Sequence, residues 1–487
     1  MFLKSMNGVR DLSFRSMESM LRRLTLSEVR TQDFDFEQVV DVASKAAGTT
    51  SGVPDEEWWK KLCRACQDKA CSTDGRRLLH TKLIHSLSQR LAVEEAYRLN
   101  ETDIEKEKIE SPFVVMGLPR SNGHMITHVF ARSGLFLCPR MQDTWSPSIV
   151  VEADRAKLFK TDSRRFERQN PNFACVRRLV GSMADDDLTL NLHIPQSFAW
   201  GLLHGLDEYL LQTIQEDQSA VFEYTKKVLK LFQWYRKFGH FSDCVKVEFN
   251  VLDNPIEVQR TGPKHVLSKL PWLIHSPLGI LNAESLHKAF PDMNVIWTHR
   301  ALASGISSLC STLAIHNSLY TGKKPSETAL AQIGEKVLGI FGSGTENAID
   351  YFGNFDKSKM VHWSNRDANR HCTRLMMKTM EHFNLDIDRH RRMHGIEGQT
   401  EFSSLQRPLH DSNLQYFGLH EGVVHQVFDA YVHQFEEFAF EKRFGVTVQD
   451  YVSLGETPAL PSLNRKQSRV DQFAEGQPAG GHFLSQH

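Results

Sequence analysis

The stretch VVMGLPRSNGHM, residues 114–125, indicates the fold more directly than any other part of the chain. A short apolar run ends there in Gly, Pro, Arg, Ser, Asn, Gly and His, and apolar residues then resume with helical spacing. This order predicts a buried parallel strand, a tight turn and a helix. Such a turn gathers backbone N–H groups at a helix N-terminus, where they bind anions. The stretch therefore predicts an α/β fold with an anion site at the end of a strand.

Two apolar runs farther along the chain have the same character. PWLIHSPLG covers residues 271–279 and MNVIWTHR covers residues 293–300, and each ends in polar residues. NAESLHKAFPD lies between them and suits a crossover helix, so the two runs predict a βαβ unit. Ligands bind where the carboxyl ends of parallel strands meet, so we expect the three polar ends to form one site. Arg120 and Arg300, with serine hydroxyls on the following helix, suit a ligand with two phosphates.

The composition is that of an ordinary soluble globular protein. The chain has 487 residues, of which 40% are hydrophobic and 24% charged. Its 58 Lys and Arg against 59 Asp and Glu give a net charge of −1, which argues against general nucleic-acid binding. No stretch approaches the ~20 apolar residues that a membrane span requires. The N-terminus lacks the apolar core of a secretory signal, and Asp11 and Glu18 count against a transit peptide, so we expect a cytoplasmic location.

The pattern divides the chain into three parts. Residues 1–50 predict a polar, partly helical extension, residues 51–450 an α/β domain, and residues 451–487 a disordered tail rich in Pro, Gly, Gln and Ser. Within the domain, apolar spacing predicts a helical hairpin over residues 55–99 and one long helix over residues 421–445. Residues 181–240 are predicted to be largely helical. Residues 245–252 are predicted to form a strand in an excursion from the main sheet.

Eight scattered cysteines in a chain of this length indicate reduced thiols. The cluster CRACQDKAC contains Cys63, Cys66 and Cys71, but no second pair follows, whereas a structural zinc site needs four ligands. The segment has the spacing of an amphipathic helix. We therefore expect no metal.

The turn lacks the GxxxxGK[ST] pattern of Walker-type loops. Instead, GLPRSNGHMITHVFARSG resembles the 5′-phosphosulfate loop of the sulfotransferase superfamily, typically GxPRSGTT followed by a helix. FPDMNVIWTHRALASGISSL resembles the second signature of that family, in which an Arg and a Ser eight residues later bind the 3′-phosphate of 3′-phosphoadenosine-5′-phosphosulfate (PAPS). PWLIHSPLGIL lies where the family usually shows WxLKSPxH. DGRRLLHTKLIHSLSQRL and FGLHEGVVHQVFDAYVHQF are similar to the bacterial-type group, so the resemblance spans residues 50–440.

The resemblance implies a P-loop-like parallel sheet flanked by helices, with N-terminal and inserted helical elements, and PAPS as co-substrate. It also implies which residues bind PAPS: Pro119, Arg120, Ser121, Asn122, Gly123, His124, Met125, Arg300 and Ser308. Arg120 is additionally expected to stabilise negative charge that develops toward the departing phosphate. The transferred group carries less charge than a phosphoryl group, so the reaction is expected to need no metal.

The chain departs from the family pattern at the positions that bear on proton transfer. Asn122-Gly123-His124 replaces Gly-Thr-Thr, His275 replaces the Lys of the KSP stretch, and Gly279 replaces its following His. Many relatives place a Glu after a Trp past the loop, but here Trp145 precedes Ser146, with Asp143 nearby. His275 and Asp143 are the candidates for the general base, with His124 third. His193 is a candidate for the acceptor pocket, whereas the aromatic stretch 197–241 is more typical of core.

These patterns predict a sulfotransferase that moves a sulfuryl group from PAPS to a hydroxyl or amine of a small molecule. Two alternatives stay open. The altered loop and the missing Lys would also fit a PAPS- or nucleotide-binding protein with impaired catalysis, and the fold would also fit a P-loop phosphotransferase. We expect no nucleic-acid partner, and the sequence leaves the oligomeric state open.

Overall fold

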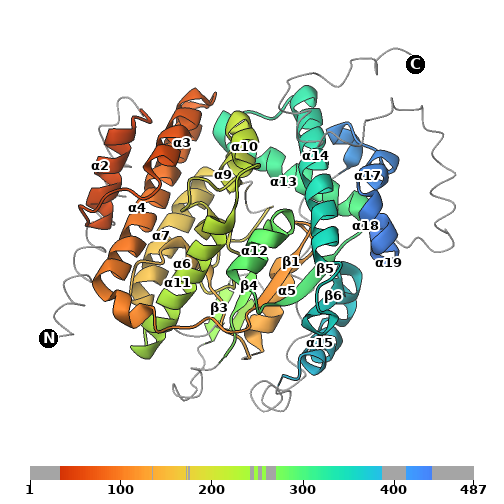
Figure 1. The fold of residues 1–487 in the computed structure, drawn as a ribbon. Coiled ribbons are helices and arrows are strands. Elements are labelled where there is room, and N and C mark those ends of the chain that lie inside the picture. Colours follow the sequence, from red (N-terminus) through yellow and green to blue (C-terminus); the bar gives the residue numbers. More distant parts are fainter. Residues whose placement is uncertain are drawn as a thin grey trace.

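A four-stranded parallel sheet forms the centre of the computed structural model (Figure 1). The model describes residues 33–385 and 413–440, except residues 134, 172, 174–175, 242–245, 250–254 and 259–269. The strands lie in the order β4 (Leu273–His275), β1 (Phe113–Gly117), β5 (Asn294–His299) and β6 (Met360–Ser364). The predicted parallel sheet flanked by helices is confirmed.

Alternating residues of β1 pack into two separate layers of helices. Phe113 and Val115 belong to a cluster with α5 (Gly123–Arg132) and α15 (Asn365–His382). Val114 and Met116 belong to a larger cluster with helices on the opposite face. Those helices are α11 (Ser219–Lys237), α12 (Ala283–Ala289), α13 (Leu302–Thr321) and α14 (Glu327–Phe352). All five residues of β1 are buried, as expected for a central strand covered on both faces.

The βαβ unit predicted for residues 271–300 is present, but its two strands are not neighbours. β1 pairs with β4 on one side and with β5 on the other. α12 therefore crosses over β1, and the polar ends of β4, β1 and β5 lie at the same edge of the sheet. Residues 360–364, which the sequence pattern did not indicate as a strand, form β6 beside β5.

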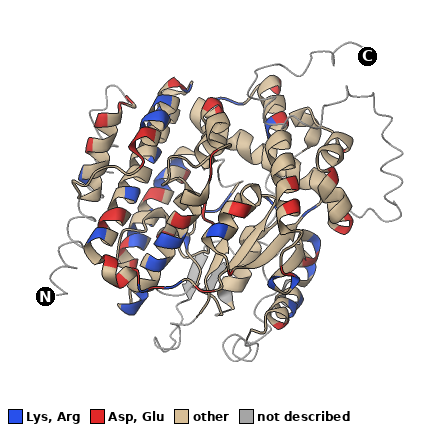
Figure 2. Cartoon of the chain, in the orientation of Figure 1, with Lys and Arg blue, Asp and Glu red and all other residues tan. Residues whose placement is uncertain are grey.

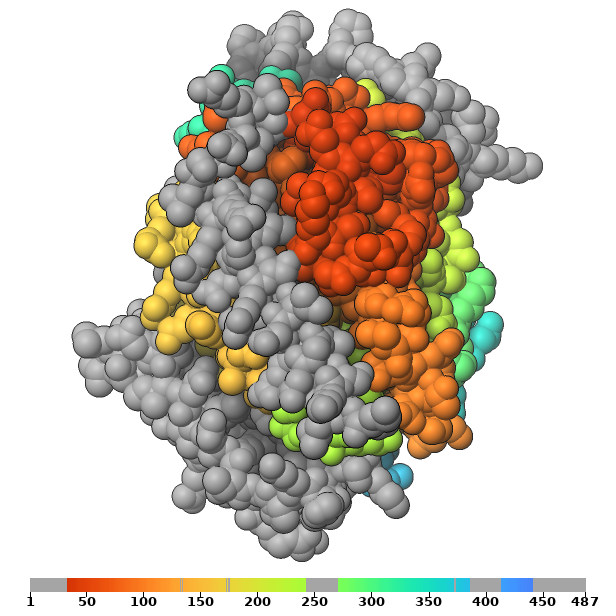
Figure 3. All heavy atoms as spheres, turned by 90° about the vertical axis from the view of Figure 1, so that its left-hand side faces the viewer, coloured from red at the N-terminus to blue at the C-terminus, as the bar shows by residue number. Residues whose placement is uncertain are grey.

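The N-terminal helices form a unit on one side of the sheet (Figures 1 and 3). They are α2 (Phe36–Ala47), α3 (Glu56–Asp68) and α4 (Thr73–Ile104), so the predicted hairpin is confirmed as α3 and α4. α4 begins one residue before Asp74-Gly75, because the Ser72 side chain accepts a hydrogen bond from the Gly75 N–H. Cys63 and Cys66 lie buried on α3 in the core that this unit forms with Trp200 and Tyr320.

The chain between α5 and α11 is also largely helical. It contains α6 (Met141–Trp145), α7 (Glu152–Gln169), α8 (Leu188–Asn191), α9 (Ala199–His204) and α10 (Asp207–Thr213). β2 (Lys246–Phe249) and β3 (Pro255–Val258) form a separate antiparallel pair, which confirms the predicted excursion from the main sheet. The aromatic residues of α11, including Trp234 and Tyr235, are buried in the main core.

The single long helix predicted for residues 421–445 is wrong. Over residues 421–439 the chain forms three short helices, α17 (Glu421–Val427), α18 (Asp429–Gln434) and α19 (Glu436–Ala439), and residues 441–445 lie outside the described part. The breaks fall at Phe428 and Phe435. The Phe435 ring lies 5.3 Å from Trp297, and Tyr431 contacts His299, so the bends let aromatic side chains pack against the end of β5.

Residues 1–32 and 441–487 also lie outside the described residues, so the predicted domain boundaries and the predicted disordered tail stay predictions. Lys and Arg are interspersed with Asp and Glu along the visible helices (Figure 2). Among the described residues, no helix has the length and apolar character needed to cross a membrane.

Candidate active site

The turn between β1 and α5 has a backbone that few residues adopt. Gly117 has φ 145°, and a Cβ at this position would lie 2.2 Å from the Thr298 carbonyl oxygen, so only glycine fits. Arg120 and Asn122 have φ 74° and 69°, in the left-handed region. Left-handed non-glycine residues concentrate at functional sites, because the surrounding structure must offset the strain. α5 then begins at Gly123, and the N–H groups of its first turn have no acceptor within the helix.

Arg120 and Arg300, predicted to bind opposite ends of one ligand, lie side by side. The Arg120 Nε donates to the Ser308 Oγ at 3.1 Å, and the Arg300 Nη1 donates to the Arg120 carbonyl oxygen at 2.9 Å. The Ser304 Oγ accepts from Arg300 Nη2 at 2.7 Å and from its Nε at 3.1 Å. The structure therefore brings together the two signatures, which are 180 residues apart.

This pair of guanidinium groups concentrates positive charge. Burial lowers the pKa of Arg120 below its usual range, and the positive charge of Arg300 lowers it further. Within the described residues, Arg120 forms no salt bridge with a carboxylate. Two cations held together in a partly buried place favour an anion with more than one charge.

The rest of the loop shows how a phosphate would fit. The Ser121 hydroxyl is buried and has no hydrogen-bond partner in the described structure. A buried hydroxyl without a partner is costly, so a bound oxygen at this point would stabilise it. The Asn122 side-chain amide donates to Asn365 and, at 3.0 Å, to Asn369 on α15. Met125 is buried and packs under the sheet. The residues present thus fit a phosphorylated ligand.

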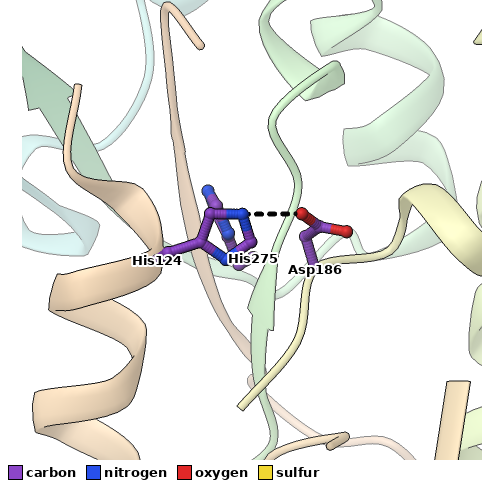
Figure 4. Close-up of side chains that lie close together, drawn as sticks. All are labelled: His124, Asp186 and His275. Carbon is purple, nitrogen blue, oxygen red and sulfur yellow. Dashed lines mark ion pairs between the residues drawn. The ribbon is translucent and has the colours of Figure 1, made fainter. Parts of the chain in front are cut away.

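His124, His275 and Asp186 form a cluster immediately beside the loop (Figure 4). The His124 Nε2 lies 2.9 Å from Asp186 Oδ2, and the two imidazole rings are 4.6 Å apart, edge to face. A Cβ on Gly123 would lie 2.1 Å from the His275 Nε2, so this glycine permits the approach of His275 to α5. Burial lowers the pKa of His275 well below its usual range, and nearby His124 adds to the effect.

The third member of the cluster comes from the acidic run 185–187, which the sequence reasoning did not single out. This segment runs parallel to the end of β4, with Asp186 opposite His275. Arg177 forms salt bridges with Asp185 and, at 3.4 Å, with Asp186. Burial alone would raise the pKa of Asp186, but the positive charge of Arg177 and the contact with His124 hold it below its usual range. Asp186 is therefore an ionised carboxylate that faces a histidine.

The last acid of the run behaves differently. Burial raises the pKa of Asp187 to about 8, although the Ser276 hydroxyl donates to it at 2.6 Å and opposes the rise. Burial therefore favours the protonated form of Asp187. A run of three acids usually indicates a solvated surface, which is why the sequence did not draw attention to residues 185–187. The one signal in the sequence was that this run lies between apolar segments.

Among the described residues, the cluster of His124, Asp186 and His275 is the group whose donor atoms could hold a metal ion. One ligand atom from each lies within 4.8 Å of the others. Two of these atoms, His124 Nε2 and Asp186 Oδ2, already contact each other. Cys63 and Cys66 belong to the core of α3, and burial raises the pKa of both thiols, which disfavours the thiolate that binds metal.

Asp143, a candidate base in the sequence, forms its side-chain hydrogen bonds in a buried ionic network rather than with this cluster. Its Oδ2 accepts from Arg140 Nε at 2.7 Å, and its Oδ1 accepts from Arg155 Nε at 2.8 Å. The Asp143 side chain and both guanidinium groups have no exposed surface. This geometry indicates that Asp143 fixes α6 against α7. His193 is also fully buried, and its Nδ1 contacts the Tyr224 hydroxyl at 3.0 Å.

The sequence of residues 112–362 matches the family model described as "Sulfotransferase family". This chain belongs to the sulfotransferase family. The matched region contains the loop, His275 and the Arg300–Ser308 signature. In this family member the loop, His275 and Arg300 all lie at the carboxyl ends of strands of the parallel sheet.

Solved structures of two mycobacterial sulfotransferases share the fold. Sulfotransferase STF9 from Mycobacterium avium is 16% identical, with a TM-score of 0.64 over 84% of this chain and 98% of its own. Sulfotransferase STF1 from Mycobacterium tuberculosis H37Rv is also 16% identical, with a TM-score of 0.64 over 82% of this chain and 100% of its own. No curated protein matches the sequence significantly.

Proposed function

We propose that this family member transfers a sulfuryl group from PAPS to a hydroxyl or amine of a small molecule. The observation that carries the proposal is the direct contact of the Arg120 loop with Arg300 and Ser308. Two half-buried cations and a buried, unpartnered Ser121 hydroxyl beside a helix N-terminus suit a ligand with a phosphate at each end.

In this proposal each side of the site holds one end of the co-substrate. Arg120, Ser121 and the N–H groups at the start of α5 bind the 5′-phosphosulfate end, and Arg300 and Ser308 bind the 3′-phosphate. PAPS supplies the sulfuryl group when bound. Arg120 and the loop amides stabilise the negative charge that grows on the oxygen toward the departing phosphate, as preorganised donors do in related transfers.

We assign the general base to His124. Its contact with Asp186 is a hydrogen bond from Nε2–H to an ionised carboxylate, which leaves Nδ1 as the atom that accepts a proton. His124 is also 42% exposed in its side chain and lies in the loop itself, so an acceptor group can reach it. His275 is buried, and its low pKa makes it a poor proton acceptor, so we assign it to positioning His124.

A transfer assay tests the function directly. We expect PAPS labelled in its sulfuryl group to transfer the label to acceptors in a panel of phenols, alcohols and amines. Adenosine 3′,5′-bisphosphate should appear in equal amount, and the reaction should proceed in EDTA, because the proposed steps use no metal.

Two outcomes would favour the rival functions. Binding of adenosine 3′,5′-bisphosphate without transfer to any acceptor would favour a catalytically impaired binding protein. Thermal stabilisation by ATP with Mg²⁺, and none by the bisphosphate, would favour a P-loop phosphotransferase. The cytoplasmic location expected from the sequence stays part of the proposal, and cell fractionation tests it.

A further inference from the structure

A cavity of about 420 Å³ has Arg177 and Asp185 in its wall, and Arg177 also binds Asp186 of the candidate active site. Residues of α4, α6 and α7 line most of it. Its walls include four aromatic side chains, Trp145, Phe159, Phe166 and Phe173. The volume lies in the range of small-molecule sites, which are typically about 300–1,000 Å³ and lined by apolar and aromatic groups.

The cavity wall includes two residues that neighbour the cluster proposed to act in catalysis. Arg177 and Asp185 are part of its wall, and Arg177 also binds Asp186, which contacts His124. On another side, the ring of the cavity residue Phe173 lies 5.4 Å from His316 of α13, the helix that also carries Ser308. The cavity wall is thus linked to the proposed base through Arg177 and Asp186, and it contacts the helix that carries Ser308.

Among the described residues, the charged groups of the cavity wall are paired except for two cations, Arg165 and Lys82. Arg177 pairs with Asp185, and Arg77 pairs with Asp74 at 3.0 Å on the exposed rim. The Asp162 carboxylate accepts from the Trp145 Nε1 at 3.0 Å. Lys82 has no hydrogen-bond or ion-pair partner among the described residues.

The surroundings of Lys82 make it a recognition group for an anion. Its ammonium lies 5.9 Å from the centre of the Phe166 ring. Burial lowers its pKa to about 8, so it is still mostly charged at pH 7. Half-buried at the cavity wall and without an acceptor among the described residues, this ammonium is placed to form a charge-assisted hydrogen bond with a ligand carboxylate.

We propose that this cavity binds the acceptor, and that the acceptor is a hydroxylated aromatic compound whose carboxylate pairs with Lys82. This inference rests on the proposed sulfuryl transfer. The aromatic body packs between the ring side chains, and the hydroxyl points toward His124. In the reaction, the acceptor oxygen forms a bond to sulfur, the bond from sulfur to the phosphate oxygen breaks, and the hydroxyl proton moves to His124 Nδ1.

Binding measurements with matched probes test the inference without turnover. The probes are hydroxylated aromatic carboxylates of one to three rings, each compared with its methyl ester, and isothermal titration calorimetry measures binding. We expect the wild-type protein to bind at least one carboxylate tenfold more tightly than its ester. Lys82→Met should remove that preference and leave ester binding unchanged, whereas Lys82→Arg should keep it.

Arg77→Met is the matched control, since it removes one positive charge from the same helix and the same cavity wall. It should leave both affinities as in the wild type. A wild-type protein that shows no preference for any carboxylate, or a folded Lys82→Met protein that keeps the preference, would overturn the inference.

The transfer assay separates this inference from the proposed function. Sulfuryl transfer to neutral phenols that does not depend on Lys82 would support the function and overturn the choice of acceptor. Carboxylate binding through Lys82 without sulfuryl transfer would uphold the cavity assignment and contradict the function.

Discussion

At the residue scale, Arg120 combines two unfavourable features at one position. Its φ of 74° is a left-handed conformation, which costs about 1–3 kcal/mol for a residue with a side chain. Its guanidinium also lies beside that of Arg300, and burial reduces the screening by water. A bound polyanion would offset the repulsion between the two guanidinium groups, so both features are those expected of a loop that binds an anion.

His124 and Asp143 give a contrast that tests the choice of base. We expect His124→Ala to lower kcat by about 10²–10⁴-fold, because a positioned proton acceptor contributes that much. Affinity for adenosine 3′,5′-bisphosphate should change little, since the loop amides and both arginines stay in place. Steady-state kinetics and bisphosphate titration measure the two quantities.

Asp143→Ala should act on stability instead. It leaves two buried guanidinium groups without their shared carboxylate, which costs about 3–5 kcal/mol of unfolding free energy. Urea denaturation measures this loss. A His124→Ala protein with unchanged kcat, together with a folded Asp143→Asn protein without activity, would reverse the assignment.

At the scale of elements, the approach of α5 to β4 sets the position of the catalytic cluster. Gly123→Ala would place a methyl group 2.1 Å from the His275 Nε2, so the ring must move or α5 must tilt. We expect a loss of about 1–3 kcal/mol in unfolding free energy, as for other overpacked sites. Differential scanning calorimetry or urea denaturation measures the change.

Gly305 on α13 supplies a control for this substitution. A Cβ at Gly305 would meet no atom within 4 Å, so Gly305→Ala should be neutral or stabilising by about 0.5–1 kcal/mol, the usual helical preference for alanine. Equal stability of the Gly123→Ala and wild-type proteins would show that His275 does not pack against α5 as described.

Elements with a strong apolar pattern were predictable from the sequence. β1, β4 and β5 are buried apolar runs that are followed by Gly, Pro or charged residues. The apolar runs predicted the parallel sheet, and the residues that follow them predicted the edge at which the candidate site lies. β6 was missed because its pattern is weak: only Trp363 of its five residues is buried. The breaks in α17–α19 depend on the contacts of Phe435 and Tyr431 with β5, which no local pattern encodes.

At the scale of the whole molecule, the site unites segments that lie far apart in the sequence. The positions of the loop at residues 117–125 and of residues 300–308 were predictable, because each stretch resembles a family motif and each follows a strand. The position of Asp186, the acid of the cluster, was not predictable from the sequence. Asp186 reaches His275 only because residues 184–187 run beside β4. Asp143 lies nearer in the sequence to the position where many relatives place an acidic residue. In the structure, however, Asp143 lies in an ionic network of its own.

The most direct test of the account is the affinity for adenosine 3′,5′-bisphosphate, measured by isothermal titration calorimetry. Arg77→Ala, which removes an exposed cation outside the phosphate site, is the control and should bind as the wild type does. Arg120→Ala and Arg300→Ala should each weaken binding by about 1.5–3 kcal/mol, or roughly 10- to 150-fold. Unchanged affinity in both folded variants would contradict the central claim that these two arginines together hold the co-substrate.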